Sequence, residues 1–200
     1  MIVSDRHRFV FIHNPKCAGT SLRQALAPYD DRGGRYWGFA EHAGRRVDLA
    51  HLTLSDLEGY PDFPLLAEYF VFTVVRHPLE RALSAYREFI TKGYLGFPAD
   101  GPDDFVLRHL DADRARFDFR FVHFCPQHHF THLAGKCRVD WIVRFERLEA
   151  DLAHLPALLG VPAEVGHENL RAETPLAFGP EAEASLRSLY ARDFQLFGYD

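Results

Sequence analysis

The sequence predicts an α/β domain of three layers, in which helices cover a mainly parallel central sheet. Three apolar runs carry this prediction: residues 9–12, 69–75 and 139–145. Each is short, rich in β-branched and aromatic residues, and followed by a helical pattern. Strands that are buried on both faces have this composition. The chain has no internal repeat, and its 200 residues are expected to form a single domain, residues 1–200.

The composition narrows the class of protein. A hydrophobic content of 47% can bury one core without disulfides or a structural metal. The three cysteines, an odd number, argue against a disulfide framework and for a reducing compartment, so a cytoplasmic location is expected. No apolar run reaches the roughly 18 residues that a membrane span needs. The net charge of -5 argues against a nucleic-acid partner.

The first strand and the turn after it form the pattern around which the chain is organised. The apolar run at residues 9–12 predicts a buried strand, and Gly19 marks the turn after it. Thr20 or Ser21 is expected to cap the helix that follows. Backbone N–H groups at such a helix start favour an anion, and Lys16 adds a full positive charge. The lysine precedes the glycine, unlike in a Walker A loop. The sequence therefore predicts a phosphate-binding loop of another kind.

The segment after the first helix is rich in Gly, Arg and aromatic residues and lacks a clear period. It predicts a long loop over residues 30–46 with one short strand at 36–39. Residues 47–50 predict a further short strand, and Thr53 or Ser55 is expected to cap the next helix.

The run YFVFTVV, residues 69–75, is the strongest strand signal and predicts a central parallel strand. It ends at Arg76, and Pro78 suits the first turn of a helix that continues to about residue 92 and ends at Gly93. The apolar face expected for this helix consists of Leu79, Ala82, Leu83, Tyr86 and Ile90.

The second half of the chain predicts a short helix at residues 103–110, a strand at 139–145, a helix at 146–159 and a final helix at 180–194. Residues 117–127 are aromatic-rich and receive no assignment. In such a sheet, ligands bind beyond the carboxyl ends of the strands. Lys16 and Arg76 each follow a predicted strand, so both are expected at one crevice.

Two motifs resemble those of a known family. The order Pro-Lys-Cys-Ala-Gly-Thr-Ser, residues 15–21, resembles the 5′-phosphosulfate loop of sulfotransferases that use 3′-phosphoadenosine 5′-phosphosulfate (PAPS), in particular the branch of carbohydrate 2-O-sulfotransferases. Arg76 and Ser84 stand at the spacing with which these enzymes bind the donor's 3′-phosphate. The resemblance extends over residues 9–199. The end of the chain also resembles the family, with Tyr190, Asp193 and Phe194 in the expected order.

The resemblance implies a P-loop-like sulfotransferase fold and transfer of a sulfuryl group from PAPS to a hydroxyl of a carbohydrate or other small polar acceptor. PAP is the implied product, and no metal is expected. The implied donor site consists of Lys16, Cys17, Ala18, Gly19, Thr20, Ser21, Arg76 and Ser84. Lys16 would also act in catalysis by stabilising negative charge on the leaving oxygen. The animal relatives are Golgi proteins held by a membrane helix, which this chain lacks, so a soluble bacterial form or a complete catalytic domain without membrane insertion is expected.

His51 is the expected general base, because a neutral histidine can accept the proton of the acceptor hydroxyl. In the 2-O-sulfotransferase branch a His-Gly-His motif supplies this base, and the run Leu49-Ala50-His51 matches only its second histidine. His13, at the end of the first strand, is the second candidate.

Other interpretations stay open at this point. Arg76 could instead pair with Glu80, and Ser84 could be an ordinary surface serine. The chain could also be a non-catalytic module that binds PAP or another nucleotide. A third hypothesis is a P-loop-type kinase using ATP and magnesium, although an arginine stands where a Walker B site has its aspartate.

A histidine-rich run is a candidate zinc site. It comprises His123, Cys125, His128, His129 and His132. If this run were helical, His128 and His132 would share one face. It lacks a paired C-x-x-C and the glutamate of H-E-x-x-H, so an aromatic-histidine surface is the preferred interpretation.

The acceptor pocket is expected to be built by loops, at residues 30–46 and 93–118. A polar loop near the end of the chain resembles the family's donor-covering segment. Its polar residues are His167, Asn169 and Arg171.

Overall fold

The computed structural model describes residues 1–93, 99–161 and 176–200. These residues form two compact units, each built from two separate segments of the chain. The described part of the first unit is residues 1–76 and 129–161, and that of the second is residues 77–93, 99–128 and 176–200.

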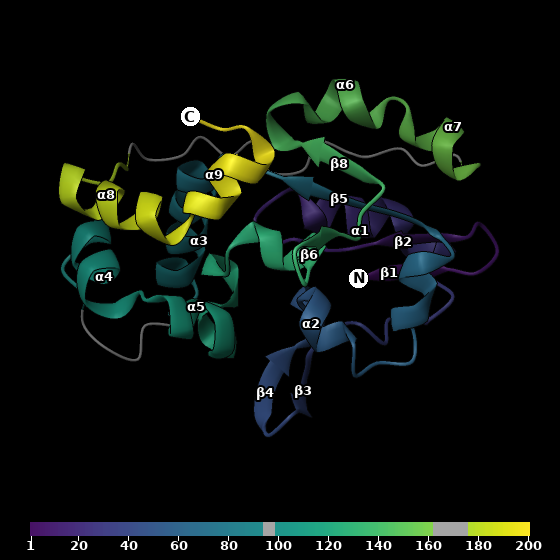
Figure 1. Cartoon of the computed structure of the whole chain (residues 1–200), viewed down its shortest axis with the longest axis horizontal. Coiled ribbons are helices and arrows are strands. Elements are labelled where there is room, and N and C mark those ends of the chain that lie inside the picture. The colour runs from purple at the N-terminus through teal and green to yellow at the C-terminus, as the bar shows by residue number, and fades with distance from the viewer. Residues whose placement is uncertain (94–98, 162–175) are drawn as a thin grey trace. The chain divides into compact units, whose positions relative to one another are not determined.

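A four-stranded sheet forms the centre of the first unit (Figure 1). Its strands, in spatial order, are β1 (Ile2–Ser4), β2 (Phe9–Phe11), β5 (Phe70–Val75) and β8 (Trp141–Arg144). β5 is parallel to β2 and to β8, whereas β1 pairs antiparallel with β2 at the edge. The predicted α/β class, the mainly parallel sheet and the central place of residues 69–75 are therefore confirmed.

Helices and hairpins surround this sheet. They are α1 (Gly19–Leu26), β3 (Phe39–His42), β4 (Arg45–Asp48), α2 (Leu54–Leu57), β6 (His132–Leu133), β7 (Lys136–Cys137), α6 (Leu148–Leu152) and α7 (Leu155–Leu159). The 3-10 helices are η1 (Ala27–Tyr29), η2 (Leu49–His51), η3 (Phe63–Ala67) and η6 (Phe145–Arg147). Figure 1 shows α6 and α7 on one side of the sheet and α2 on the other. Side chains of α1, α6 and α7 pack with those of the strands into one apolar core.

Three local predictions in this unit need correction. The strand expected at residues 36–39 begins only at Phe39, because Tyr36 is buried and its hydroxyl donates to Asp62 Oδ2 at 2.5 Å. Burial raises the pKa of the Tyr36 hydroxyl well above its usual range, and the bond to Asp62 acts in the same direction. The strand expected at residues 47–50 is the second arm of a hairpin and ends at Asp48.

The helix expected at residues 146–159 is divided into α6 and α7. Pro156 explains the break, because a proline has no N–H to donate to the carbonyl four residues earlier and its ring clashes with that carbonyl. α7 ends at Gly160, which has a left-handed backbone.

The second unit is helical. Its helices are α3 (Pro78–Thr91), α4 (Pro102–His109), α5 (Ala112–Phe117), α8 (Pro180–Leu189), α9 (Ala191–Phe197) and the 3-10 helix η4 (Phe119–Phe124). The 3-10 helix η5 (Gln127–Phe130) leads back to the first unit. Clustered aromatic rings fill its core, with Phe105 and Phe121 stacked at 6.0 Å. The final helix expected at 180–194 bends at Tyr190 and continues to Phe197.

One residue of the predicted apolar face of α3 is exposed, and two residues outside that face are buried. Ile90 is 43% exposed, whereas Phe89 and Arg81 are buried. Arg81 donates from Nη1 to the His123 carbonyl at 2.9 Å and from Nη2 to the Cys125 carbonyl at 2.7 Å. These bonds allow a charged side chain to occupy a core position.

Within residues 1–93, 99–161 and 176–200, no helix has both the length and the apolar composition needed to cross a bilayer.

Candidate functional site

The loop between β2 and α1 is fastened to the neighbouring strand. Thr73 Oγ1 donates to the Ile12 carbonyl at 2.7 Å, and Asn14 Nδ2 donates to the Val74 carbonyl at 2.9 Å. Both side chains are buried. The start of the loop is thereby held at the carboxyl end of β5, where α/β proteins bind ligands.

Two residues of this loop have left-handed backbones. The φ angles of Lys16 and Ala18 are 64° and 58°. Such values are uncommon for residues with a Cβ and cluster at functional sites. An alternation of right- and left-handed residues turns successive N–H groups toward one concavity that can bind an anion. The loop conformation therefore fits the phosphate-binding prediction.

α1 begins directly after this turn, with Ala18 as its N-cap and no capping side chain. The prediction that Thr20 or Ser21 caps the helix is wrong, since both lie inside the first turn. A side-chain cap would occupy one of the free amides of the helix start. The helix start has no such cap, and its amides and the positive end of the helix dipole favour an anion there.

Cys17 lies between the two left-handed residues, but its side chain points into the core. It is buried, and its thiol donates to the Pro15 carbonyl at 3.4 Å. It packs in the same apolar cluster as Leu22 and Leu26. Any contribution of Cys17 to donor binding therefore falls to its backbone.

Gly19 allows a close contact between the loop and His13. A Cβ placed on Gly19 would lie 1.9 Å from two atoms of the His13 ring. The same ring stacks on Phe11 with centroids 6.0 Å apart. Glycine is thus required here for packing, in addition to any approach of a ligand to the backbone.

The two candidate bases are neighbours. The His13 and His51 rings have centroids 4.3 Å apart and are inclined at 62°. His51 Nδ1 lies 3.1 Å from the His13 carbonyl oxygen. Because a carbonyl only accepts, Nδ1 carries the hydrogen, and the lone pair of the neutral ring lies on Nε2. His51 therefore has a defined tautomer with a basic nitrogen at Nε2.

The turn that carries His51 is also fixed. Asp48 is the N-cap of η2, and its Oδ1 accepts the Ala50 N–H at 2.9 Å. Directly after η2, Thr53 caps α2 in a capping box with Asp56, which confirms one of the two caps expected there. His51 is thus held between two capped turns.

Arg76 follows β5 at the same edge of the sheet as the loop after β2. Its guanidinium carbon lies 4.3 Å from the centroid of the Phe145 ring. A guanidinium stacked on an aromatic face keeps the N–H donors at its edge for an oxyanion. Ser84 lies on α3 in the second unit and is half-buried.

The histidine-rich run does not form the α-helix that a shared face of His128 and His132 requires. Gln127–Phe130 is a 3-10 helix, and His132 lies in β6. His128 Nδ1 lies 2.7 Å from Oδ1 of Asp193, a fully buried carboxylate that also accepts two backbone N–H groups of this turn. The helical arrangement considered for zinc is therefore wrong. The loop containing His167, Asn169 and Arg171 lies outside the described residues.

A model of the sulfotransferase family matches residues 1–200. The chain belongs to the sulfotransferase family. Carbohydrate sulfotransferase 14 of Danio rerio is 27% identical over 243 residues, covering 100% of this chain and 62% of that protein. The human protein of the same name is 29% identical over 192 residues, covering 82% of this chain and 48% of its own length. Carbohydrate sulfotransferase 10 of Xenopus laevis is 25% identical and is covered to 67%.

The chain thus spans 62% and 48% of the lengths of the first two relatives. A crystal structure of a sulfotransferase from Alicyclobacillus acidocaldarius is 16% identical, with 96% of each chain covered and a TM-score of 0.43.

Two residues that support the loop between β2 and α1 were not predicted as site residues. Asn14 and Thr73 make the bonds that fasten the loop to β5. Asn14 lies two residues after the apolar run of residues 9–12 and precedes a proline, so a buried polar role could have been inferred from its position. The partner of Thr73 lies far away in the sequence, and no local pattern points to it.

Proposed function

We propose that this chain transfers a sulfuryl group from PAPS to a hydroxyl of a carbohydrate acceptor and releases PAP. The observation that carries the proposal is that two features lie in the same unit. One is the loop with left-handed backbones at Lys16 and Ala18, which leads into a helix without a side-chain cap. The other is His51, whose tautomer is fixed by its hydrogen bond to the His13 carbonyl. Family membership and the names of the relatives, carbohydrate sulfotransferases 14 and 10, support the reaction and the acceptor class.

The donor residues follow from the chemistry of each group. The backbone of residues 16–21, with the Thr20 and Ser21 side chains, holds the 5′-phosphate at the start of α1. Arg76 binds the 3′-phosphate with its planar donors, and Ser84 adds a hydroxyl. PAPS supplies the activated sulfuryl group.

His51 Nε2 accepts the proton of the acceptor hydroxyl while the hydroxyl oxygen forms a bond to sulfur. The bond from sulfur to the bridging oxygen of the donor breaks, and its electron pair stays on the 5′-phosphate of PAP. Lys16 stabilises the charge that develops on that oxygen, which lowers the energy of the transition state more than that of the bound donor. The protein supplies the base that accepts the proton and the cations that stabilise the negative charge, so the proposed reaction needs no metal.

The central experiment is transfer of labelled sulfate from PAPS to a panel of oligosaccharides. We expect Lys16→Ala to lower kcat by at least about 100-fold, as removal of a transition-state charge contact does. Lys136→Ala is the matched control, because Lys136 is an exposed lysine on β7 in the same unit. A loss of transfer in the control as well would remove the support for Lys16.

The two histidines are separated by a second pair of variants. His51→Gln should lower kcat by about 100-fold or more and remove the rise of rate with pH that a general base produces. His13→Gln should leave that pH dependence in place. The opposite pattern would assign the base to His13.

The other hypotheses give different results in a binding screen. Stabilisation by PAP without transfer to any acceptor would indicate a non-catalytic module. Stabilisation by ATP and magnesium but not by PAP would indicate a kinase. We also propose a reducing compartment such as the cytoplasm, because three cysteines, an odd number, argue against a disulfide framework.

A further inference from the structure

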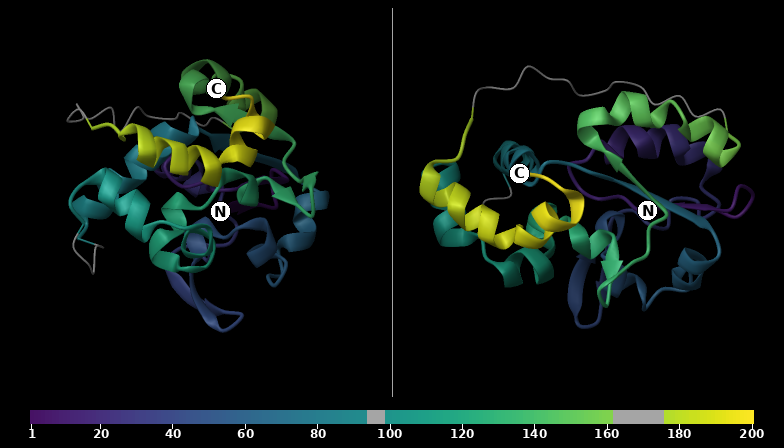
Figure 2. Two further views of the ribbon diagram at one scale, coloured as in Figure 1. Left: turned by 60° about the vertical axis from the view of Figure 1, so that its left-hand side comes forward. Right: turned by 45° about the horizontal axis from the view of Figure 1, so that its top comes forward.

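The β3–β4 hairpin extends away from the central sheet in both views of Figure 2. Its second arm leads directly into the turn that carries His51, because β4 ends at Asp48 and η2 begins at the next residue. An isolated two-stranded hairpin is only marginally stable in water. The orientation of this hairpin, and of the turn that follows it, therefore depends on its contacts with other elements.

An ion pair joins the hairpin to α2. Arg45, the first residue of β4, donates from Nη2 to Oδ1 of Asp56 on α2. Asp56 is buried, and the Arg45 side chain is 24% exposed. A buried carboxylate needs a charged or hydrogen-bonded partner, and removing that partner destabilises a protein more than breaking an exposed pair does. The pair therefore fixes β4 relative to α2.

The Asp56 carboxylate also belongs to the cap of α2. Its Oδ2 accepts from the Thr53 hydroxyl at 2.7 Å within the capping box, while Oδ1 accepts from Arg45. Thr53 lies two residues after His51, and Asp48 lies three residues before it. One carboxylate thus connects the hairpin that precedes His51 with the helix that follows it.

The hairpin contacts the end of α2 at a second point. The His42 and Tyr60 rings have centroids 5.0 Å apart. A Cβ placed on Gly59 would lie 2.5 Å from Cε1 of the His42 ring, so the glycine permits this close approach. His42 is the register partner of Arg45, which places the ring contact and the ion pair at the same end of the hairpin.

We propose that Arg45 and Asp56 are positioning residues for the general base. They hold the hairpin to α2, so the turn between these elements keeps the His51 ring where its Nδ1 donates to the His13 carbonyl. The lone pair of the neutral ring then stays on Nε2. A misplacement of about 1 Å can lower an enzymatic rate by about 100-fold. This inference rests on the proposed function, since it concerns the base of that reaction.

The orientation of His51 is tested without turnover, by NMR of its imidazole nitrogens at a pH where the ring is neutral. We expect the hydrogen on Nδ1 in the parent protein. Arg45→Gln and Asp56→Asn should each give a mixture of both tautomers, because the ring is no longer held at the His13 carbonyl. Gly59→Ala displaces the hairpin without removing a charge, so it should give the same change even where a charge variant fails to fold. An unchanged Nδ1–H signal in all three variants would overturn the inference.

The steady-state kinetics of sulfate transfer give a second readout. Arg45→Gln and Asp56→Asn should each lower kcat by at least about tenfold and leave the KM for PAPS within about twofold, because the donor binds elsewhere. Arg45→Lys should recover part of the lost kcat, since it restores the charge that faces Asp56. The double variant should lose no more activity than the weaker single variant, because the two residues act through one contact. Additive losses would count against the inference.

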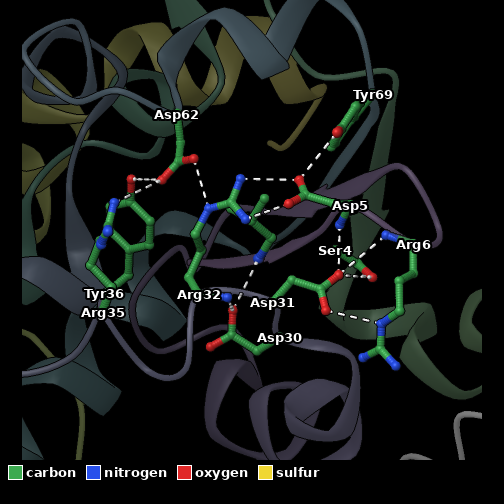
Figure 3. A network of polar contacts seen from close by, with 11 residues as sticks. Ser4, Asp5, Arg6, Asp30, Asp31, Arg32, Arg35, Tyr36, Asp62 and Tyr69 are labelled. Atoms are coloured by element: carbon green, nitrogen blue, oxygen red, sulfur yellow. Dashed lines mark hydrogen bonds and ion pairs between the residues drawn. The ribbon is translucent and has the colours of Figure 1, made fainter.

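Arg32 provides the matched control for a general loss of stability. Its side chain is 16% exposed, and it pairs with two carboxylates, with Nη1 2.6 Å from Asp5 and Nε 2.7 Å from Asp62 (Figure 3). These three residues lie outside both the hairpin and η2. Arg32→Gln should lower the free energy of unfolding, as Arg45→Gln does, but keep the Nδ1–H signal and kcat. Equal losses of both in the two variants would overturn the inference.

The two readouts distinguish this inference from the proposed function. If transfer occurs and the Arg45 and Asp56 variants change neither the tautomer nor kcat, the positioning role is excluded and the function remains. If those variants disturb the His51 tautomer but the parent protein transfers sulfate to no acceptor, the link from the ion pair to His51 remains and the proposed function fails.

Discussion

Gly19 has a direct effect on the candidate catalytic pair, because a side chain there would collide with the His13 ring. We predict that Gly19→Ala lowers the free energy of unfolding by about 1–3 kcal/mol, as overpacking does. The displaced His13 ring would also disturb its contact with the His51 ring, so transfer activity should fall. Urea denaturation and a rate measurement test both effects.

A double-mutant cycle separates this clash from other effects of the new methyl group. In a His13→Ala background the ring is absent, and Gly19→Ala should cost much less stability than in the parent protein. Equal costs in the two backgrounds would contradict the packing role of Gly19.

Arg32 links stability to pH. The hydrogen bond from Arg32 holds the pKa of Asp5 below its usual range. A lowered pKa in the folded state adds stability above about pH 4, the ordinary range of this group, and that stability is lost as the pH falls through the folded value. We predict that Arg32→Ala makes the acid-induced loss of unfolding free energy shallower, as measured by urea denaturation between about pH 6 and pH 2.

The control for this pH effect is Arg147→Ala, which removes an exposed i,i+4 ion pair with Asp151. Exposed pairs of this kind contribute about 0.5 kcal/mol or less. Its acid profile should match that of the parent protein, and identical profiles for the Arg32 and Arg147 variants would refute the prediction.

At the level of residues, the sequence predicts types of contact better than partners. Thr53 could be assigned as a cap because its capping-box partner Asp56 is three residues away. Thr20 and Ser21 could not be placed correctly, because the strained turn at Ala18 starts the helix one residue before Thr20. The contact of His13 with His51 joins residues that are 38 apart in the chain, and no local pattern encodes it.

Among the elements, the parallel strands were predictable because burial on both faces leaves a continuous apolar run. β1 was missed, since Ser4 follows Ile2 and Val3 directly and the strand shows no longer apolar run. On α3 the helical period is real, but Arg81 is buried by bonds to carbonyls of the distant segment 123–125, which a hydrophobic pattern cannot represent.

Asp193 connects α9 to the turn at residues 127–128. Its fully buried carboxylate accepts the backbone N–H groups of Gln127 and His128 and contacts the His128 ring. We predict that Asp193→Ala lowers the free energy of unfolding by about 3 kcal/mol, because these buried donors would lose their acceptor. Glu183→Ala on α8 removes only an exposed pair with Arg187 and should cost about 0.5 kcal/mol or less. Similar losses in urea denaturation would contradict the buried role.

For the whole molecule, the way in which the two units share the chain affects whether they unfold together. Each compact unit is built from two segments that are separated in the sequence by a segment of the other unit. We propose that residues 1–200 nevertheless act as a single sulfotransferase domain, because the second segment of the first unit is reached only through the second unit.

This proposal predicts a single unfolding transition. Both tryptophans, Trp37 and Trp141, lie in the first unit, whereas the second unit is helical. Tryptophan fluorescence and far-UV circular dichroism should therefore give the same midpoint in urea, as in two-state unfolding. Separate midpoints would show that the units unfold independently.

The left-handed backbone of Ala18 implies a conflict between folding and binding. Relieving the strain of this backbone should stabilise the protein in the absence of ligand, since this conformation costs about 1–2 kcal/mol for a residue with a Cβ and little for glycine. Ala18→Gly is therefore expected to preserve or slightly raise the free energy of unfolding. The same substitution should lower the affinity for PAP, because a loop with glycine at this position samples many conformations before the ligand binds. The most stable form of this loop would then be a poorer receptor, and selection for activity would oppose selection for stability at this one residue.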